Sequence, residues 1–278
     1  MKVAVFGAGT MGSGIAQVFA TAGNETLLFA SSVESAKRHK DKLAKSLEKR
    51  VEKGKMTAEA KDAILNNIKT VEIEEAADCD LILETIKEEI AAKRELMEKL
   101  DAMCKPETIF ATNTSSLSIT QIAYGLNHPV VGMHFFNPAP TMKLVEVIAG
   151  MTTPAEVVEQ IKVLSTELGK TPVEVNEAPG FVVNRILIPM INEAICLLEC
   201  GVASAADIDT AMQLGANHPM GPLALSDLIG NDIVLNIMDV LYTETGDSKY
   251  RASVLLRKMV RSGNLGRKTK KGFFSYEK

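Results

Sequence analysis

The most constraining feature of the chain is a glycine-rich turn directly behind its first apolar strand. Residues 1–6 read Met-Lys-Val-Ala-Val-Phe, residues 7–14 read Gly-Ala-Gly-Thr-Met-Gly-Ser-Gly, and a helical pattern follows to Thr21. In such a unit Gly7 permits a tight turn, Gly9 lets the backbone approach a pyrophosphate, and Gly12 lets the helix pack on the strand. The helix amides then face the phosphates. The pattern predicts a dinucleotide site that includes Thr10 and Met11, in preference to a glycine turn of an unrelated strand–helix unit.

The second predicted strand, Glu25–Phe29, ends without the carboxylate that usually accompanies this turn. That acidic residue lies about 20 positions after the glycines and accepts hydrogen bonds from the adenosine ribose. Here the strand runs into Ala30, Ser31 and Ser32. Glu25 lies at the wrong end of the strand to replace it.

Strand and helix patterns alternate through the first two-thirds of the chain, which predicts a doubly wound, Rossmann-type parallel sheet. Beyond Pro179–Gly180 only helical patterns follow, which predicts an all-helical second domain. We therefore expect an α/β dinucleotide-binding domain over residues 1–180 and a helical domain over residues 181–278. The later strands are expected at 70–73, 80–84, 108–112, 130–135 and 143–148, and the helices of the second domain at 181–200, 205–214, 222–243 and 251–261.

Composition excludes several classes of function. The formal net charge of −4 gives no reason to expect a nucleic-acid partner. The first apolar run is too short for a signal-peptide core, and no run approaches the roughly 18 residues of a membrane helix. We expect a cytoplasmic protein without a membrane partner. The cysteines lack metal-ligand or redox-pair spacing, which favours buried free thiols and no metal; they are Cys79, Cys104, Cys196 and Cys200.

The sharpest chemical constellation is His134 with Glu146. They flank a proline-rich connector between two strand patterns, and an antiparallel pair folded near Pro140 places residues whose numbers sum to about 280 opposite each other. A carboxylate beside the imidazole would fix its tautomer and make a general acid/base near neutral pH. A histidine on a strand is otherwise more often structural, and the aligned acid favours catalysis.

Two polar stretches lie where they can complete such a site. Asn113, Ser115 and Ser116 follow a strand directly, at the edge where open α/β sheets place ligands. In the alternative interpretation Ser116 caps a helix that begins at Leu117. Asn184 lies among apolar residues at the start of the second domain, where an amide either makes a helix contact or faces a cleft.

Five motifs in order resemble the L-3-hydroxyacyl-CoA dehydrogenases, and the resemblance covers essentially the whole chain. They are Gly-Ala-Gly-Thr-Met-Gly-Ser-Gly (7–14), Asn-Thr-Ser-Ser-Leu-Ser-Ile (113–119), His-Phe-Phe-Asn-Pro-Ala-Pro (134–140), Pro-Gly-Phe-Val-Val-Asn-Arg (179–185) and His-Pro-Met-Gly-Pro (218–222).

The resemblance implies hydride transfer between a nicotinamide and a 3-ketoacyl or 3-hydroxyacyl thioester, here acetoacetyl-CoA and 3-hydroxybutyryl-CoA. It implies a homodimer through the helical domain. His134 would be the catalytic base and Glu146 its orienting carboxylate. The resemblance further implies Ser115 and Asn184 at the substrate carbonyls, Glu88, Lys93 and Asn113 at the cofactor, and Ser46 and Lys53 at coenzyme A.

Nine lysines and arginines between Lys37 and Lys55 outnumber the nearby acids and suit the phosphates of coenzyme A. For any single lysine a solvated helix face is the simpler interpretation. Two other functions stay open. One is a related β-hydroxyacid or sugar-acid dehydrogenase without CoA contacts, and the other is a non-catalytic structural relative.

The end of the second strand departs from the family pattern, which commonly has an acid at Ala30 and uses NAD. Without that carboxylate a 2′-phosphate is not repelled, and the hydroxyls of Ser31 and Ser32 can donate to it. The sequence therefore favours NADP over NAD, with Lys37 or Arg38 as nearby cations. Against this preference, no arginine directly follows the strand, and Glu34 can fold back toward the ribose.

Overall fold

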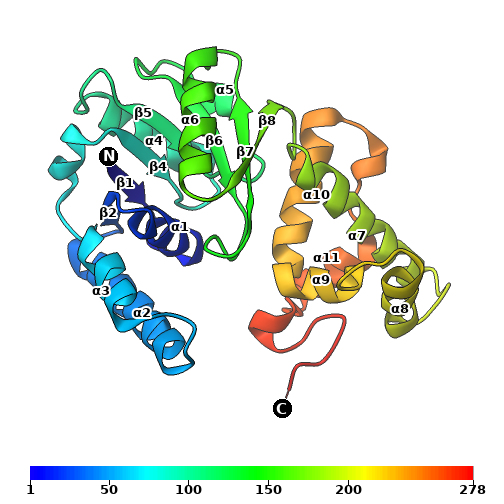
Figure 1. Cartoon of the computed structure of the whole chain (residues 1–278). Helices are drawn as coiled ribbons and strands as arrows, with labels where there is room; N and C mark the ends of the chain where they lie inside the picture. Colours follow the sequence, from blue (N-terminus) through cyan, green and yellow to red (C-terminus); the bar gives the residue numbers. More distant parts are fainter. Residues whose placement is uncertain (278) are drawn as a thin grey trace. The chain divides into compact units, whose positions relative to one another are not determined.

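The structure, a computed structural model, describes residues 1–277 and divides into two compact units. The first is Met1–Glu177, and the second begins at Ala178 (Figure 1). Within the described residues, no helix combines the length and apolarity that crossing a membrane requires. Lys278, the end of the predicted second domain, lies outside the described residues.

The first unit is built on one eight-stranded sheet with the order β3-β2-β1-β4-β5-β6-β7-β8. Strands are added on both sides of β1, which is the doubly wound arrangement that the sequence predicted. All neighbours pair in parallel except β6 and β7, which are antiparallel. The strands are β1 (Lys2–Phe6), β2 (Glu25–Phe29), β3 (Ile68–Lys69), β4 (Leu81–Glu84), β5 (Ile109–Thr112), β6 (Val130–Phe135), β7 (Leu144–Ala149) and β8 (Thr171–Asn176).

Helices cover the sheet because its strands are apolar on both faces. Val3, Val5 and Leu83 point to one face, where they form a single core cluster with α1 and α6. The alternate residues, such as Ala4 and Ile82, are equally buried and leave the other face to α4 and α5. The helices of this unit are α1 (Thr10–Thr21), α2 (Val33–Glu52), α3 (Ala58–Asn67), α4 (Ile90–Asp101), α5 (Ile119–Ala123) and α6 (Ala155–Glu167), with a 3₁₀ helix η1 at Ile73–Asp78.

The second unit is helical and has its own core, formed by residues such as Ile191, Ile195 and Met238. The sequence predicted one helix over residues 222–243, and this was wrong. Gly230 adopts φ = 110°, a conformation that ends α9 and begins α10. The helices are α7 (Val183–Glu199), α8 (Ala205–Gly215), α9 (Pro222–Ile229), α10 (Asn231–Thr245) and α11 (Val254–Arg261), with 3₁₀ helices η2 (Ser248–Tyr250) and η3 (Arg267–Thr269).

Two further predictions from the sequence were wrong. Residues 70–73 are not a strand, because β3 ends at Lys69 and the alternating Val71 and Ile73 line a pocket instead. The cysteines are free, but they are not all buried. Cys200 is exposed because it caps the end of α7.

Candidate active site

The glycine loop between β1 and α1 leaves no room for side chains on its inner side. A Cβ on Gly12 would lie 1.6 Å from the carbonyl oxygen of Gly7, and a Cβ on Gly7, at φ = 105°, would lie 2.7 Å from the carbonyl oxygen of Thr85. At Gly9, by contrast, a Cβ would meet nothing within 4 Å. The loop is thus closed where the helix packs and open at Gly9, as a phosphate-bearing ligand requires.

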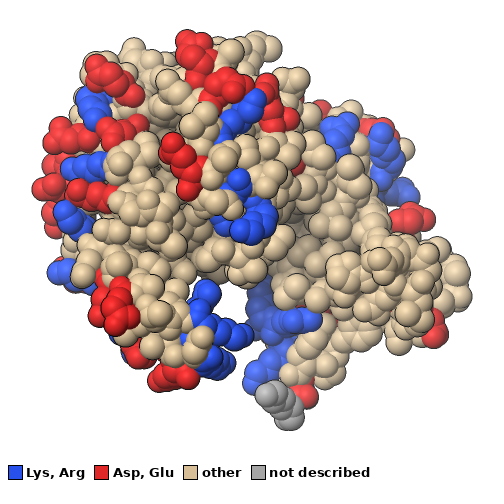
Figure 2. All heavy atoms as spheres, in the orientation of Figure 1, with Lys and Arg blue, Asp and Glu red and all other residues tan. Residues whose placement is uncertain are grey.

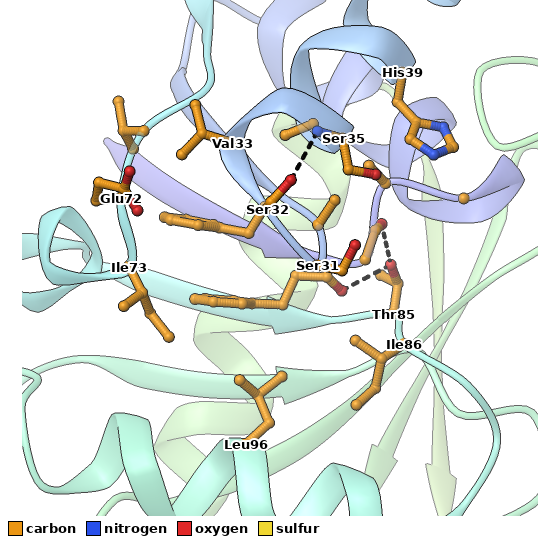
Figure 3. Close-up of a pocket in the computed structure, with 18 of the residues that line it drawn as sticks. Ser31, Ser32, Val33, Ser35, His39, Glu72, Ile73, Thr85, Ile86 and Leu96 are labelled. Carbon is orange, nitrogen blue, oxygen red and sulfur yellow. Dashed lines mark hydrogen bonds between the residues drawn. The ribbon is translucent and has the colours of Figure 1, made fainter.

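Thr85, at the end of β4, holds this loop in place. Its hydroxyl lies 3.0 Å from the carbonyl oxygen of Phe6 and 2.8 Å from that of Gly7 (Figure 3). Thr85 was not predicted from the sequence, because only the parallel pairing of β1 with β4 brings it to the loop.

A pocket of about 830 Å³ opens beside the loop. Ser31, Ser32 and His39 lie on the α2 side, and Ile73 and Leu96 form an apolar wall across from them (Figure 3). An apolar wall facing hydroxyls is what an adenosine with a polar ribose needs. The glycine loop, Phe6, Phe29 and Ala30 complete the lining on this side, together with Val33, Ser35 and Ala36.

The end of β2 bears no carboxylate toward this pocket. Ser32 caps α2 by accepting a hydrogen bond from the amide of Ser35, at 3.1 Å. Glu34 is exposed and does not line the pocket. Hydrogen bonds from its own backbone amide and from Ser32 lower the pKa of its carboxyl, so it is held in the first turn of α2.

The cations of this pocket differ from those expected. Lys37 and Arg38 are exposed and do not line it, whereas the lysines Lys87 and Lys99 do, together with the imidazole of His39. One helical turn separates Ser35 from His39, so both face the glycine loop while the two predicted cations point away.

A buried ionic network lies at the end of β4. The ammonium of Lys93 contacts both carboxylate oxygens of Glu84, at 2.8 and 3.0 Å, and lies 3.2 Å from Glu88. Glu84 and Lys93 are almost completely buried. Burial raises the pKa of Glu84, although Lys93 opposes this shift. Glu84 was not predicted from the sequence, although a carboxylate directly after three apolar strand residues was a visible signal.

Glu88 fixes the loop that carries Ser115. One carboxylate oxygen accepts hydrogen bonds from the Thr114 hydroxyl at 2.6 Å and from the amide of Ser115 at 2.8 Å. Asn113 ties the same loop to β6, since its side-chain oxygen accepts the amide of Phe135 at 2.8 Å. The helix that follows is capped by Ser118, so the prediction that Ser116 caps it was wrong.

His134 and Glu146 face each other across the β6–β7 pair, in the register expected from their numbering. Nδ1 of His134 lies 2.8 Å from a carboxylate oxygen of Glu146, and both side chains are buried. The ring of Phe136 packs against the imidazole at 4.5 Å between centroids. The carboxylate orients the imidazole, as an acid/base residue requires.

A second pocket, of about 520 Å³, lies between α1, α2 and the β6–β7 connector. Gly9 and His39 line both pockets. Ser46 lines the second pocket with the cations Lys42 and Arg50. Lys53 is exposed at the end of α2 and is not in this lining. Lys and Arg side chains gather along one edge of the α2–α3 region (Figure 2).

Asn184 belongs to the second unit. It lies in the first turn of α7, directly after Val183, and is 9% exposed. The remaining predicted residues of the site all lie in the first unit.

Two family models match the chain along its length. Residues 2–178 match "3-hydroxyacyl-CoA dehydrogenase, NAD binding domain", and residues 180–276 match "3-hydroxyacyl-CoA dehydrogenase, C-terminal domain". The chain belongs to the 3-hydroxyacyl-CoA dehydrogenase family. It is therefore an oxidoreductase that uses a nicotinamide cofactor.

Several relatives of this dehydrogenase are similar over their full length. A 3-hydroxybutyryl-CoA dehydrogenase of Clostridioides difficile is 54% identical, and the match covers 100% of both chains. One from Bradyrhizobium diazoefficiens is 46% identical over 99% of this chain and 95% of its own. The crystal structure of (S)-3-hydroxybutyryl-CoA dehydrogenase PaaH1 from Ralstonia eutropha has a TM-score of 0.94 at 43% identity, covering 100% of this chain and 99% of that one.

Proposed function

We propose that this dehydrogenase interconverts acetoacetyl-CoA and (S)-3-hydroxybutyryl-CoA. The buried His134–Glu146 pair carries the proposal, because it supplies an oriented acid/base at the carboxyl edge of the sheet, beside the loop held by Asn113. Relatives that are 46–54% identical and bear the name 3-hydroxybutyryl-CoA dehydrogenase support the choice of a four-carbon thioester.

In the proposed mechanism His134 takes or returns the proton of the hydroxyl on C3. Glu146 holds Nδ1, so the proton moves through Nε2 of the ring. Ser115 and Asn184 would donate hydrogen bonds to the ketone and thioester oxygens, a contribution on the order of 3 kcal/mol for one well-placed donor. The nicotinamide, when bound, supplies or accepts the hydride.

The glycine loop would hold the cofactor. Gly7 and Gly12 keep the loop tight, Gly9 gives the open approach to the pyrophosphate, and Thr10 and Met11 begin the helix whose amides face it. Glu88, Lys93 and Asn113 would lie at the nicotinamide end. Their hydrogen bonds tie that end of the site to the Ser115 loop, so cofactor and substrate would share one framework.

We propose that the cofactor is NADP(H) in preference to NAD(H). Ala30 leaves the end of β2 without a carboxylate, and Ser31 and Ser32 bring hydroxyls to the pocket there. Lys87 and Lys99 supply cations in the lining, in place of the expected Lys37 and Arg38, and His39 adds an imidazole. Glu72 in the same lining is the one acidic side chain that opposes a phosphate there.

Coenzyme A would lie along the second pocket. Ser46 is in its lining, and Lys42 and Arg50 are better placed for phosphates than Lys53. Lys53, beyond the end of this lining, would reach only a more distant phosphate. The solvated-face interpretation therefore fits Lys53 better than it fits Arg50.

We further propose a homodimer formed through the helical unit, which exposes the large apolar side chains of Ile186, Val202 and Leu214. The helical unit would thus serve substrate and dimer contacts, and residues 1–180 the dinucleotide. The four free cysteines suit the reducing cytoplasm, where we propose that the enzyme acts.

The test is a spectrophotometric assay with acetoacetyl-CoA and either NADPH or NADH. We expect rapid oxidation of the cofactor, a higher kcat/KM with NADPH, and no turnover of free acetoacetate. Turnover of free acetoacetate at the same rate would instead indicate a dehydrogenase without CoA contacts. Ala30→Asp should shift the preference toward NADH. A higher kcat/KM of the unmodified enzyme with NADH would overturn the NADP proposal alone.

A further inference from the structure

Lys170, directly before β8, is a buried lysine whose ammonium binds only backbone oxygens. Its Nζ donates to the carbonyl oxygens of Ala139 at 2.6 Å and Met142 at 2.8 Å. The side chain is 93% buried, and within residues 1–277 no carboxylate forms an ion pair with it. Burying a charged group without a counterion costs free energy. A buried ammonium at this position therefore needs a structural or functional explanation.

Both carbonyls belong to the connector between β6 and β7, residues 136–143. This connector has few hydrogen bonds of its own, because Pro138 and Pro140 lack amide hydrogens. Two amides, those of Thr141 and Met142, donate to the carbonyl of Pro138 at 2.9 and 3.0 Å. Lys170, which lies outside the connector, adds two charge-assisted hydrogen bonds to its carbonyl oxygens. Such bonds are stronger than hydrogen bonds between neutral groups.

The residues of this connector form one wall of the second pocket. Residues 137–141 all line it. On the α1 side the connector is in close packing, since a Cβ on Gly14 would lie 3.4 Å from the Cβ of Ala139. The shape of this wall therefore depends on two contacts of Ala139: its packing against α1 and its hydrogen bond to Lys170.

We propose that Lys170 is a positioning residue for the thioester substrate: its ammonium holds the 137–142 connector in the shape that binds coenzyme A in the second pocket. The inference rests on the proposed function of that pocket. His134 and Glu146 are fixed separately by the β6–β7 ladder, which pairs four residues on each strand. Lys170 should therefore govern binding of the thioester and have little influence on proton transfer.

Lys170→Met tests this proposal, because it keeps a four-atom apolar stem and removes the ammonium. We expect the KM for acetoacetyl-CoA to rise about tenfold, since two charge-assisted hydrogen bonds are lost. The KM for the nicotinamide cofactor and kcat should stay within about twofold. Lys170→Arg, which keeps a charged donor, should recover part of the lost affinity.

Lys143→Met is the matched control. Lys143 is exposed on the same connector, and its ammonium makes one long contact, 3.5 Å from the carbonyl oxygen of Gly169. This variant should leave both KM values unchanged.

Melting curves of each variant separate positioning from general damage. The proposal fails if Lys170→Met leaves the KM for acetoacetyl-CoA unchanged, or if both KM values rise together with a lower Tm. If Lys170→Met does not fold, Lys170→Gln takes its place under the same expectations. An unmodified enzyme without activity on acetoacetyl-CoA would overturn the proposed function itself. An active enzyme with no effect at Lys170 would overturn only this inference.

Discussion

Two buried histidines lie at opposite ends of β6, His134 within the strand and His128 just before it, and each contacts a carboxylate through Nδ1. His134, near the carboxyl end, lies 2.8 Å from Glu146, and His128, just before the amino end, lies 2.6 Å from Asp101. By residue type, distance and burial the two pairs are nearly the same. They differ in which end of a parallel strand they occupy.

The surroundings of His128 are those of a structural residue. Its Nε2 lies 2.9 Å from the carbonyl oxygen of Lys105, and its ring stacks on Phe110 at 4.5 Å between centroids. Asp101 also accepts the amides of Asn127 and His128. This pair joins the end of α4 to the loops before β5 and β6, at the amino edge of the sheet, where open α/β folds do not bind ligands.

His134 lies at the opposite edge, on the strand next to β5, which the Ser115 loop follows. A histidine beside a carboxylate is thus no evidence of catalysis by itself. The edge of the sheet on which the pair lies distinguishes the two cases, and each prediction below contrasts them.

The largest expected effect is that of His134→Gln on turnover. Glutamine can still donate to Glu146 but cannot transfer a proton, so kcat should fall about 1,000-fold. The thermal midpoint should change by less than about 3 °C. Steady-state rates and melting curves of His128→Gln provide the matched control, which should keep kcat within about twofold and lose stability. Equal kcat values of His134→Gln and His128→Gln would mean that the edge of the sheet does not separate a catalytic from a structural histidine.

Glu146→Gln should lower kcat about a hundredfold, because the imidazole loses the carboxylate that orients it. The steady-state rate with acetoacetyl-CoA is the measurement. A kcat within about twofold of that of the unmodified enzyme would assign the orienting role to another group.

Asp101→Asn should reduce stability and leave turnover intact. The free energy of unfolding should fall by about 2 kcal/mol, because a charged acceptor of several hydrogen bonds is replaced. Urea unfolding gives this value, and the assay with acetoacetyl-CoA gives the turnover. A loss of kcat comparable to that of Glu146→Gln would mean that both edges of the sheet take part in catalysis.

The smallest expected effect is the pH dependence of the stability loss that Asp101→Asn causes. Burial raises the pKa of Asp101, but hydrogen bonds from Asn127 and His128 outweigh it and bring the pKa below its usual 3.8. A lowered pKa in the folded state stabilises the fold above pH 3.8, and the stabilisation disappears as the pH falls through the folded value. The difference between wild type and Asp101→Asn should therefore shrink below about pH 4 in urea titrations. If the difference in the free energy of unfolding stayed constant with pH, the charge of the Asp101 carboxylate would not be its cause.

Much of this framework is predictable from the sequence, because strand and turn patterns are local. The glycine loop follows from its spacing, and the pairing of His134 with Glu146 follows from the length of one connector. The break at Gly230 was missed because the apolar period continues across it, and a single glycine inside a helix pattern does not reveal its φ angle.

The residues that support the site could not be predicted, since they depend on neighbours distant in the chain. Thr85 reaches the glycine loop only through the pairing of β4 with β1. Lys170 reaches the connector only because β8 is added beside β7. Likewise, whether Lys37 or His39 faces the pocket beside the glycine loop depends on the rotation of α2, which a run of basic residues does not define.

The antiparallel pairing of β6 with β7 has an evolutionary consequence. Side chains alternate between the faces of a sheet, so inserting or deleting one residue in the connector would bring a neighbour of Glu146, pointing to the other face, opposite His134. A shift of the register by one residue or by two would place an apolar residue of β7 opposite His134 in place of Glu146. A lineage in which the connector changed length and moved the register would therefore have to recruit a new partner for the histidine.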